Sequence, residues 1–212
     1  MTFKRARSKE HIEERYQSIM KRTKTLFMME DYEDITLVSI AKELNISRTS
    51  FYNYFQSKEE LFLALLKEEY LSCEEECRQT FTTRLEIEIF AHKLVTIFLK
   101  RPLFIKLLSL HASALENKAG YTIMEKFKKD TLPFFKTLPA ILCQQFPNAK
   151  ESDIWLFIAQ FNLLITCFYQ YSNIPSDQVA IMMELKTFGD APLLTPEDFF
   201  TQTVLNLMQP LI

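Results

Sequence analysis

The stretch that decides the fold is residues 36–55, which read TLVSIAKELNISRTSFYNYF. Its apolar residues recur at helical spacing, and Thr36 and Ser47 are hydroxyl residues placed to cap two successive helices. Asn45 falls between them, where the chain must turn sharply, and Asn accepts left-handed backbone angles better than most residues. A helix of about two turns, a turn of about four residues and a second short helix form the layout of a helix-turn-helix.

The helix-turn-helix divides into an inward and an outward set of side chains. The inward set fills the joint between the helices: Ile40, Leu44, Ile46, Phe51 and Tyr54. The outward set lies near the start of the second helix: Arg48, Thr49, Ser50 and Asn53. Arg pairs with a guanine edge, Asn pairs with an adenine edge, and Thr or Ser adapts to either. A polar face is more often simply solvated, but no acidic residue occurs between Asn45 and Gln56, which favours base contacts in DNA.

Residues beside this unit offer contacts to phosphate, which supplies most of the affinity of proteins for DNA. Thr36 and Ser47 place hydroxyls and free amides at helix N-termini, which suits an anion. Lys58 lies in the first turn of the next helix, where a phosphate would offset its unfavourable interaction with the helix dipole. Tyr52 and Tyr54 could add hydroxyl contacts, although Tyr54 is equally suited to the core.

Basic residues concentrate at the N-terminal end. Residues 1–29 hold eight Lys or Arg against three Glu, whereas residues 30–60 hold three Lys or Arg against seven acids. Such a charge run is usually a solvated tail, but beside a helix-turn-helix we expect it to reach a DNA groove or backbone. The net charge of the whole chain, −2, argues against a general polyanion binder.

Composition excludes several other classes of protein. With 212 residues, 48% apolar and 25% charged, the chain is expected to form one or two globular domains. No uninterrupted apolar run of about 18 residues occurs, so we expect no membrane span. Only two glycines are present, which leaves no GxGxxG or Walker loop. Four cysteines are too few for a disulfide scaffold, and the N-terminus lacks the apolar core of a secretory signal, so we expect a cytoplasmic protein.

Scarce glycine, and eight prolines placed mostly between apolar-periodic stretches, predict an all-α chain of about nine or ten helices. Ser57 and Glu60 have the spacing of a capping box, and Pro133 and Pro139 should kink or split the helix that contains them. Besides the two helices of residues 36–55, we expect helices at roughly His11–Met29, Lys58 to beyond Cys77, Leu85–Leu99, Leu103–Glu116, Tyr121–Phe146, Asn148–Tyr171, Pro175–Phe188 and from Thr195 onward.

A family resemblance emerges from the residues that follow the turn. Residues 51–61, FYNYFQSKEEL, together with Thr-x-x-x-Ile-Ala at 36–41 and Leu26-Phe27, resemble the N-terminal domain of the TetR family of bacterial transcriptional regulators. The resemblance covers about residues 11–70. Two departures are Asn45, where the family usually has glycine, and Asp31 before Tyr32, where a glycine usually follows the first helix.

The resemblance implies roles for single residues and for the whole chain. It makes Thr36, Arg48, Ser50, Tyr52, Tyr54 and Lys58 DNA contacts, with Thr49 and Asn53 as sequence readers. It implies a homodimer that reads a palindrome in double-stranded DNA, and an all-helical C-terminal domain that binds a small-molecule effector and releases the DNA. The corresponding division is a DNA-binding domain at 1–58, a connecting helix at about 58–80 and an effector-binding and dimerisation domain at 81–212.

The C-terminal domain is less specific in sequence. Asn148–Tyr171 and Pro196–Leu211 are candidates for an isologous dimer contact, although packing within one copy explains their apolar character equally well. Each aromatic residue of this domain fits the core as readily as a pocket. A ligand, if one binds, should be apolar or flat. The candidate pocket residues are Phe104, Leu107, His111, Met124, Phe127, Phe157, Phe161 and Tyr169.

We expect no catalytic group, cofactor or metal site. His11, His92 and His111 show no HExxH spacing, and no Gly-x-Ser-x-Gly elbow occurs. Cys73 and Cys77 lie one helical turn apart and could sense oxidants or bind a metal, but ordinary helix positions are favoured. The alternative from another class is a helical ligand-binding or interaction module whose helix-turn-helix no longer binds DNA. Repression and activation both stay open.

Overall fold

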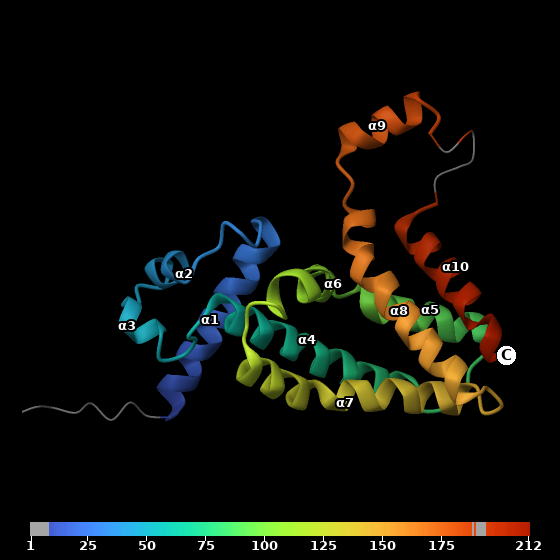
Figure 1. The fold of residues 1–212 in the computed structure, drawn as a ribbon, viewed down its shortest axis with the longest axis horizontal. Coiled ribbons are helices and arrows are strands. Elements are labelled where there is room, and N and C mark those ends of the chain that lie inside the picture. The colour runs from blue at the N-terminus through green and yellow to red at the C-terminus, as the bar shows by residue number, and fades with distance from the viewer. Residues whose placement is uncertain (1–8, 188, 190–193) are drawn as a thin grey trace, which may run out of the picture.

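The structure is a computed structural model, and it describes residues 9–187, 189 and 194–212 (Figure 1). All regular structure in these residues is helical, as predicted. The α-helices are α1 (Lys9–Met29), α2 (Leu37–Glu43), α3 (Arg48–Phe51), α4 (Lys58–Thr80), α5 (Ile87–Leu99), α6 (Pro102–Leu110), α7 (Tyr121–Gln145), α8 (Glu151–Ser172), α9 (Ser176–Glu184) and α10 (Pro196–Met208). A π-helical turn, His111–Leu115, follows α6, and a 3₁₀ turn, Gln209–Leu211, follows α10.

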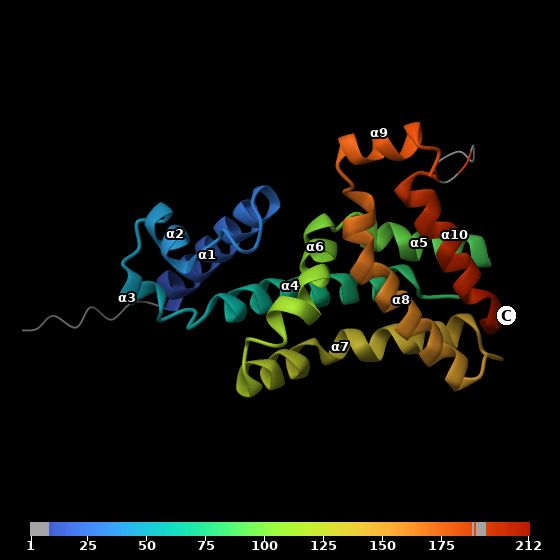
Figure 2. The ribbon, with the colours of Figure 1, turned by 45° about the horizontal axis from the view of Figure 1, so that its top comes forward.

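The first three helices and the start of α4 gather at one end of the molecule (Figures 1 and 2). Helix α1 turns one face to the core, where Ile19 and Phe27 are fully inaccessible to solvent. Phe27 meets Phe62 of α4 edge to face, with 5.0 Å between the ring centroids. This small aromatic core orients α2 and α3 on the outside of the molecule.

Helix α4 connects this end to the larger helical domain, and in both views it runs beside α7 (Figures 1 and 2). Its start is capped as predicted by Ser57, whose Oγ accepts the Glu60 N–H at 3.0 Å. The reciprocal half of the capping box differs from the prediction, because Glu60 Oε2 accepts the N–H of Gln56 at 2.6 Å. The carboxylate therefore secures the turn before the helix.

The two prolines were predicted to kink or split this helix, and they do not split it, because α7 stays one element through Pro133 and Pro139. Each proline removes one backbone hydrogen bond to the carbonyl four residues earlier. Those carbonyls belong to Lys129 and Phe135, which are exposed residues, so water can replace the lost donors. The opposite face of α7 is buried against α4 and holds the helix together.

Helix α8 crosses the larger domain and packs against α6, α7 and α10. The prediction that no segment could span a membrane needs correction, because α8 is long and apolar enough by length and composition alone. A helix that packs one apolar face against the core of a protein meets the same test, and α8 buries Ile154, Phe157, Phe161, Ile165 and Phe168 in this way.

The segment after α8 is the most exposed helical part of the described chain. Helix α9 has no buried residue, and it ends at Glu184 instead of reaching Phe188, which lies outside the described residues. The early end follows from Lys186, whose φ of 49° is incompatible with continuing an α-helix. The last helix begins as predicted, with Thr195 Oγ1 accepting the Asp198 N–H at 3.0 Å.

Candidate nucleic-acid interface and ligand cavity

Helix α2 is fixed by bonds local to its first turn. The Ser39 N–H donates to Thr36 Oγ1 at 3.0 Å, and the Thr36 N–H donates to Ser39 Oγ at 3.1 Å. The helix ends at Glu43 with Leu44 as its C-cap, and Asn45 adopts a φ of 53°, the left-handed angle expected of it. These observations confirm the predicted cap and turn.

Helix α3 is a single helical turn, and non-helical turns follow it as far as Tyr54. Ser47 caps it as predicted, with its Oγ accepting the Ser50 N–H at 3.1 Å. The helix is anchored by Phe51 and Phe55, which are 1% and 2% exposed. Because the aromatic rings fill the inner side, the remaining side chains must face outward.

The outward side chains of α3 form a polar face. Arg48, Thr49 and Asn53 are exposed, whereas Ser50 and Tyr52 are half-buried. The guanidinium of Arg48 lies over the Tyr52 ring, 5.6 Å from its centroid. The face offers an Arg donor fork, an amide and hydroxyls, which are the groups that read base edges in a major groove.

The two capping residues and Tyr54 occupy different surroundings. Thr36 and Ser47 are exposed, although their hydroxyls already accept backbone N–H groups of their own helices. Tyr54 is half-buried and packs against the core, so its ring has a structural role whether or not its hydroxyl reaches DNA.

Lys58 is held inside the domain more firmly than the sequence indicates. Its Nζ lies 3.8 Å from the centroid of the Tyr32 ring and donates to the Tyr32 carbonyl. Burial lowers the pKa of Lys58 below its ordinary value. The Tyr32 hydroxyl in turn donates to Glu59 at 3.2 Å. Lys58 therefore ties the loop after α1 to the start of α4, and a phosphate would have to compete with these bonds.

Several cations of the predicted basic region are paired with acids. Arg22 of α1 bonds to Glu43 of α2. Lys24 lies 3.0 Å from Glu68 and 3.6 Å from Glu69, both on α4. Residues 1–8, which hold the predicted basic arm, lie outside the described residues. The positive charge that the described part offers to DNA is therefore smaller than the sequence count.

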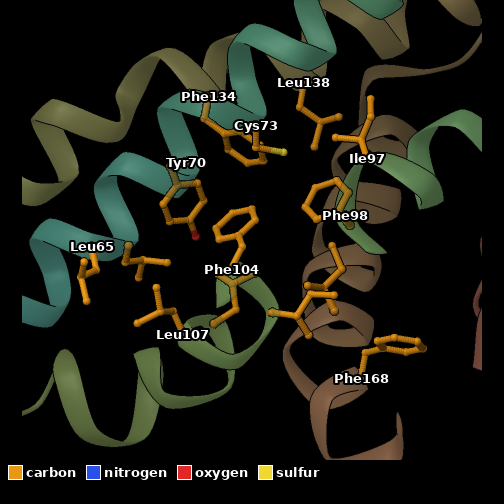
Figure 3. Packing of buried hydrophobic residues seen from close by; sticks show 14 of the residues in the cluster. Leu65, Tyr70, Cys73, Ile97, Phe98, Phe104, Leu107, Phe134, Leu138 and Phe168 are labelled. Atoms are coloured by element: carbon orange, nitrogen blue, oxygen red, sulfur yellow. The ribbon is translucent and has the colours of Figure 1, made fainter. Parts of the chain in front are cut away.

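An apolar cavity of about 190 Å³ lies in the larger domain, with walls from α4, α5, α6, α7 and α8. Two of the predicted pocket residues, Phe104 and Phe161, line it. Sequence reasoning missed the others, among them Tyr70, Phe134 and Trp155. Figure 3 shows four of the lining rings, with the ring of Phe104 between those of Tyr70 and Phe98 and the ring of Phe134 next to Tyr70.

The other predicted pocket residues lie elsewhere. Leu107 and Phe157 are fully buried in the core, and Met124 is half-buried against it. Tyr169 lines a cleft between α6 and the segment after α8, and Phe127 borders a groove near Tyr16 and Tyr54.

His111 packs on the ring of Phe127, with 5.4 Å between the ring centroids. Burial lowers its pKa, and this effect outweighs the attraction of Glu116, whose carboxylate lies 3.6 Å away. The imidazole therefore belongs to the wall between α7 and the π-helical turn, outside the lining of the apolar cavity.

Helix α6 links this cavity to the DNA-binding end. Phe104 and Leu108 line the cavity, and Lys106 between them is buried and points the other way. The Lys106 ammonium donates to the carbonyls of Phe27 at 2.6 Å and Glu30 at 3.1 Å, at the end of α1. A cation is favourable at the C-terminus of a helix, and α1 has no basic residue of its own in its last turn.

The paired cysteines of α4 are unreactive positions. Cys73 and Cys77 are both buried. The hydrogen bond that its thiol makes to Cys77 and burial raise the pKa of Cys73, so the thiol stays protonated and is a poor nucleophile. Within the described residues no cluster of His, Cys, Asp and Glu side chains could hold a metal ion.

Two family models match the chain. Residues 19–65 match "Bacterial regulatory proteins, tetR family", and residues 64–189 match "Tetracyclin repressor-like, C-terminal domain". The two ranges meet inside α4. No curated protein sequence matches the chain.

Solved structures share the fold over nearly the whole chain. The fatty acid degradation regulator FadR from Bacillus halodurans has a TM-score of 0.58 at 14% identity, over 91% of this chain and 97% of that one. FadR from Bacillus subtilis in complex with stearoyl-CoA has a TM-score of 0.54 at 13% identity, over 92% and 98%. A transcriptional regulator from Aquifex aeolicus has a TM-score of 0.52 at 13% identity, over 93% and 99%. At such identities the likeness shows the fold alone.

Proposed function

This chain belongs to the TetR family of bacterial transcriptional regulators, and we propose that it is a ligand-responsive repressor that binds a palindromic operator as a homodimer. A small apolar effector releases it from the DNA, and its place of action is the cytoplasm. The observation that carries the proposal is the polar outer face of α3, held on a capped helix-turn-helix with its aromatic residues turned inward.

Within this face the side chains divide into readers and anchors. Arg48 pairs with a guanine edge, Asn53 with an adenine edge, and Thr49 contacts a neighbouring base. The hydroxyls of Ser50 and Tyr52 contact the flanking backbone. The remaining backbone contacts come from Thr36, Ser47, Tyr54 and Lys58.

The homodimer is supported by the outer face of α8. Leu156 and Leu163 are 53% and 67% exposed. No charged residue occurs between Asp153 and Asp177. Only 28% of the most apolar 18-residue stretch of this helix is buried within one copy. A second copy would cover this uncharged face, and it would add the second recognition helix that a palindrome needs at a distance of about 34–36 Å.

Release by the effector is supported by the path through α6. A compound in the cavity presses on Phe104 and Leu108, and the same short helix holds the end of α1 through Lys106. A shift of α6 therefore tilts α1 and, with it, the helix-turn-helix. The two recognition helices of the dimer then no longer match successive major grooves.

The experiment is a selection of bound genomic fragments of the source organism with the full-length protein at moderate salt. We expect one palindromic sequence to be enriched, and the Arg48→Ala variant, which changes an exposed residue, to lose that enrichment while staying folded. If the folded wild-type dimer enriches no palindrome, the chain is instead a helical ligand-binding module whose helix-turn-helix does not bind DNA.

A further inference from the structure

Half of the residues that line the cavity are aromatic. The rings of Phe98 and Phe104 are nearly parallel, at 17°, with centroids 5.8 Å apart. Phe161 stands at 84° to Phe98, and Tyr70 at 63° to Phe134, with centroid distances of 5.1 and 5.0 Å. Rings arranged in this way favour a flat occupant, because offset and edge-to-face contacts are the preferred aromatic geometries.

The lining of the cavity contains no charged side chain. Three charged side chains of the surrounding elements are engaged elsewhere. Arg101 bonds to Glu76 at 2.7 Å, Glu74 accepts the hydroxyl of Thr137 at 2.8 Å, and Lys106 points to α1. A carboxylate or phosphate in the cavity would lose its hydration without gaining a counter-charge, which strongly disfavours its entry.

Two polar groups of the lining are left for a ligand. Tyr70 is 3% exposed, and its hydroxyl makes no hydrogen bond to any described residue. Burial raises the pKa of Tyr70, so the hydroxyl keeps its proton and can donate. Asn162 is exposed beside Trp155 and Ala159, and its side-chain amide also makes no bond within the described part of the chain. A ligand oxygen or nitrogen would give either group a hydrogen-bond partner.

The size of the cavity limits its occupant. Its volume of about 190 Å³ is below the range of roughly 300–1,000 Å³ that is usual for drug-sized ligands. A dry cavity of about 150 Å³ is known to hold benzene. The space therefore suits one or two aromatic rings.

We infer that the cavity binds an uncharged compound of one or two aromatic rings that carries a single hydrogen-bonding group, of the chemical class of simple phenols. The inference rests on the proposed role of this cavity as the effector site. It sets this chain apart from the solved relative that was crystallised with stearoyl-CoA, because that ligand is large and charged.

The test is calorimetric titration of the free, full-length protein with a matched pair, 4-propylphenol and 4-propylbenzoate, and with stearoyl-CoA. We expect the phenol to bind at least about tenfold more tightly than the benzoate, because only the benzoate brings an uncompensated charge. Binding should also change the emission of Trp155, the only tryptophan of the chain, which lines the cavity. Equal or tighter binding of the benzoate or of stearoyl-CoA would overturn the inference.

Two variants test whether the compound binds in this cavity. Ala159 is exposed at the lining, so Ala159→Trp should fill the opening and abolish calorimetric binding of the phenol. Lys136→Trp adds the same side chain at an exposed residue of α7 outside the lining and should leave binding unchanged. Unchanged binding in folded Ala159→Trp would refute the site.

A third variant tests the buried hydroxyl. Tyr70→Phe should weaken binding of 4-propylphenol but not of propylbenzene, which has no hydroxyl to lose. If both compounds weaken equally, Tyr70 acts through packing alone and the proposed hydrogen bond is wrong.

The experiments distinguish a failure of this ligand class from a failure of the proposed function. Binding of the phenol without release of the selected DNA would keep the ligand class and refute its role as effector. Release of the DNA by stearoyl-CoA, with no binding of the phenol, would keep the effector-released repressor and refute the ligand class.

Discussion

The helix-turn-helix end and the larger helical domain are stabilised in different ways. Each of α2, α3 and the start of α4 is capped by a hydroxyl side chain, from Thr36, Ser47 and Ser57 respectively. Helices α5, α6, α7, α8 and α9 begin without any side-chain cap bond, and among the described helices of the larger domain α10 alone has one, from Thr195. Their positions depend on contacts between aromatic residues far apart in the chain, such as Tyr70 with Phe134. Local bonds thus fix the DNA-binding unit, whereas distant packing fixes the ligand-binding unit.

The largest expected effect breaks the packing of the larger domain. Phe104 is fully buried and contacts Phe98 and Tyr70, so Phe104→Ala should lower the free energy of unfolding by about 3–5 kcal/mol. Thr49→Ala, at an exposed position, should change it by less than about 0.5 kcal/mol. Urea denaturation measures both, and a loss below about 1 kcal/mol for Phe104→Ala would contradict packing as the main stabiliser.

The next effect concerns DNA binding alone. Arg48→Ala should weaken binding to the selected operator by roughly 1–3 kcal/mol, because one base-reading side chain is lost from each copy. Arg48 is exposed, so the free energy of unfolding should stay within about 0.5 kcal/mol of the wild type. Fluorescence anisotropy with operator and scrambled duplexes measures the affinity. An equal loss on both duplexes would show that Arg48 contacts the backbone instead of a base.

A smaller effect compares a capped helix with an uncapped one. Ser47→Ala removes the bond to the Ser50 N–H and should cost about 1 kcal/mol of stability. Lys150 precedes α8 without a side-chain cap bond, so Lys150→Ala should change stability by less than about 0.5 kcal/mol. Thermal or urea unfolding of the pair measures the difference. Equal effects would remove the contrast between the two regions.

The smallest expected effect is a pH dependence of the larger domain. The pKa of His111 is lowered in the folded protein by burial, and the ring faces Glu116, Lys128 and Phe127. The unfolded chain therefore binds the proton more tightly, so stability should fall as the pH drops through 6.5, the ordinary pKa of histidine.

Urea midpoints measured between about pH 7 and pH 5 report this loss. His111→Gln should flatten the slope in that range, because the titrating imidazole is gone. A wild-type protein that gains stability on acidification, or a variant with the same slope, would show that His111 is not the responsible group.

Much of the DNA-binding unit could be predicted from its sequence. The caps at Thr36 and Ser47 and the left-handed angle at Asn45 depend on residues within four positions of one another. Short-range chemistry of this kind is visible in a single sequence. The bonds of Lys58 to the Tyr32 carbonyl and of Lys106 to the end of α1 were not predictable, because they join residues 26 and 79 positions apart.

The ligand cavity could be predicted only in part. Phe104 and Phe161 line it, but Leu107 and Phe157 on the same helices are core residues. Which face of a helix meets a cavity depends on how the neighbouring helices are rotated, and that rotation follows from the packing of all of them. An apolar pattern identifies a buried face without telling a core position from a cavity wall.

The most direct test of the central claim compares the affinity of the full-length protein for the selected palindrome with its affinity for a scrambled duplex at the same salt concentration. A sequence-reading dimer should prefer the palindrome by at least about 10³-fold. Its affinity for both duplexes should fall as salt rises, because phosphate contacts release counterions. Equal affinity for the two duplexes at every salt concentration would contradict the claim that the outer face of α3 reads DNA.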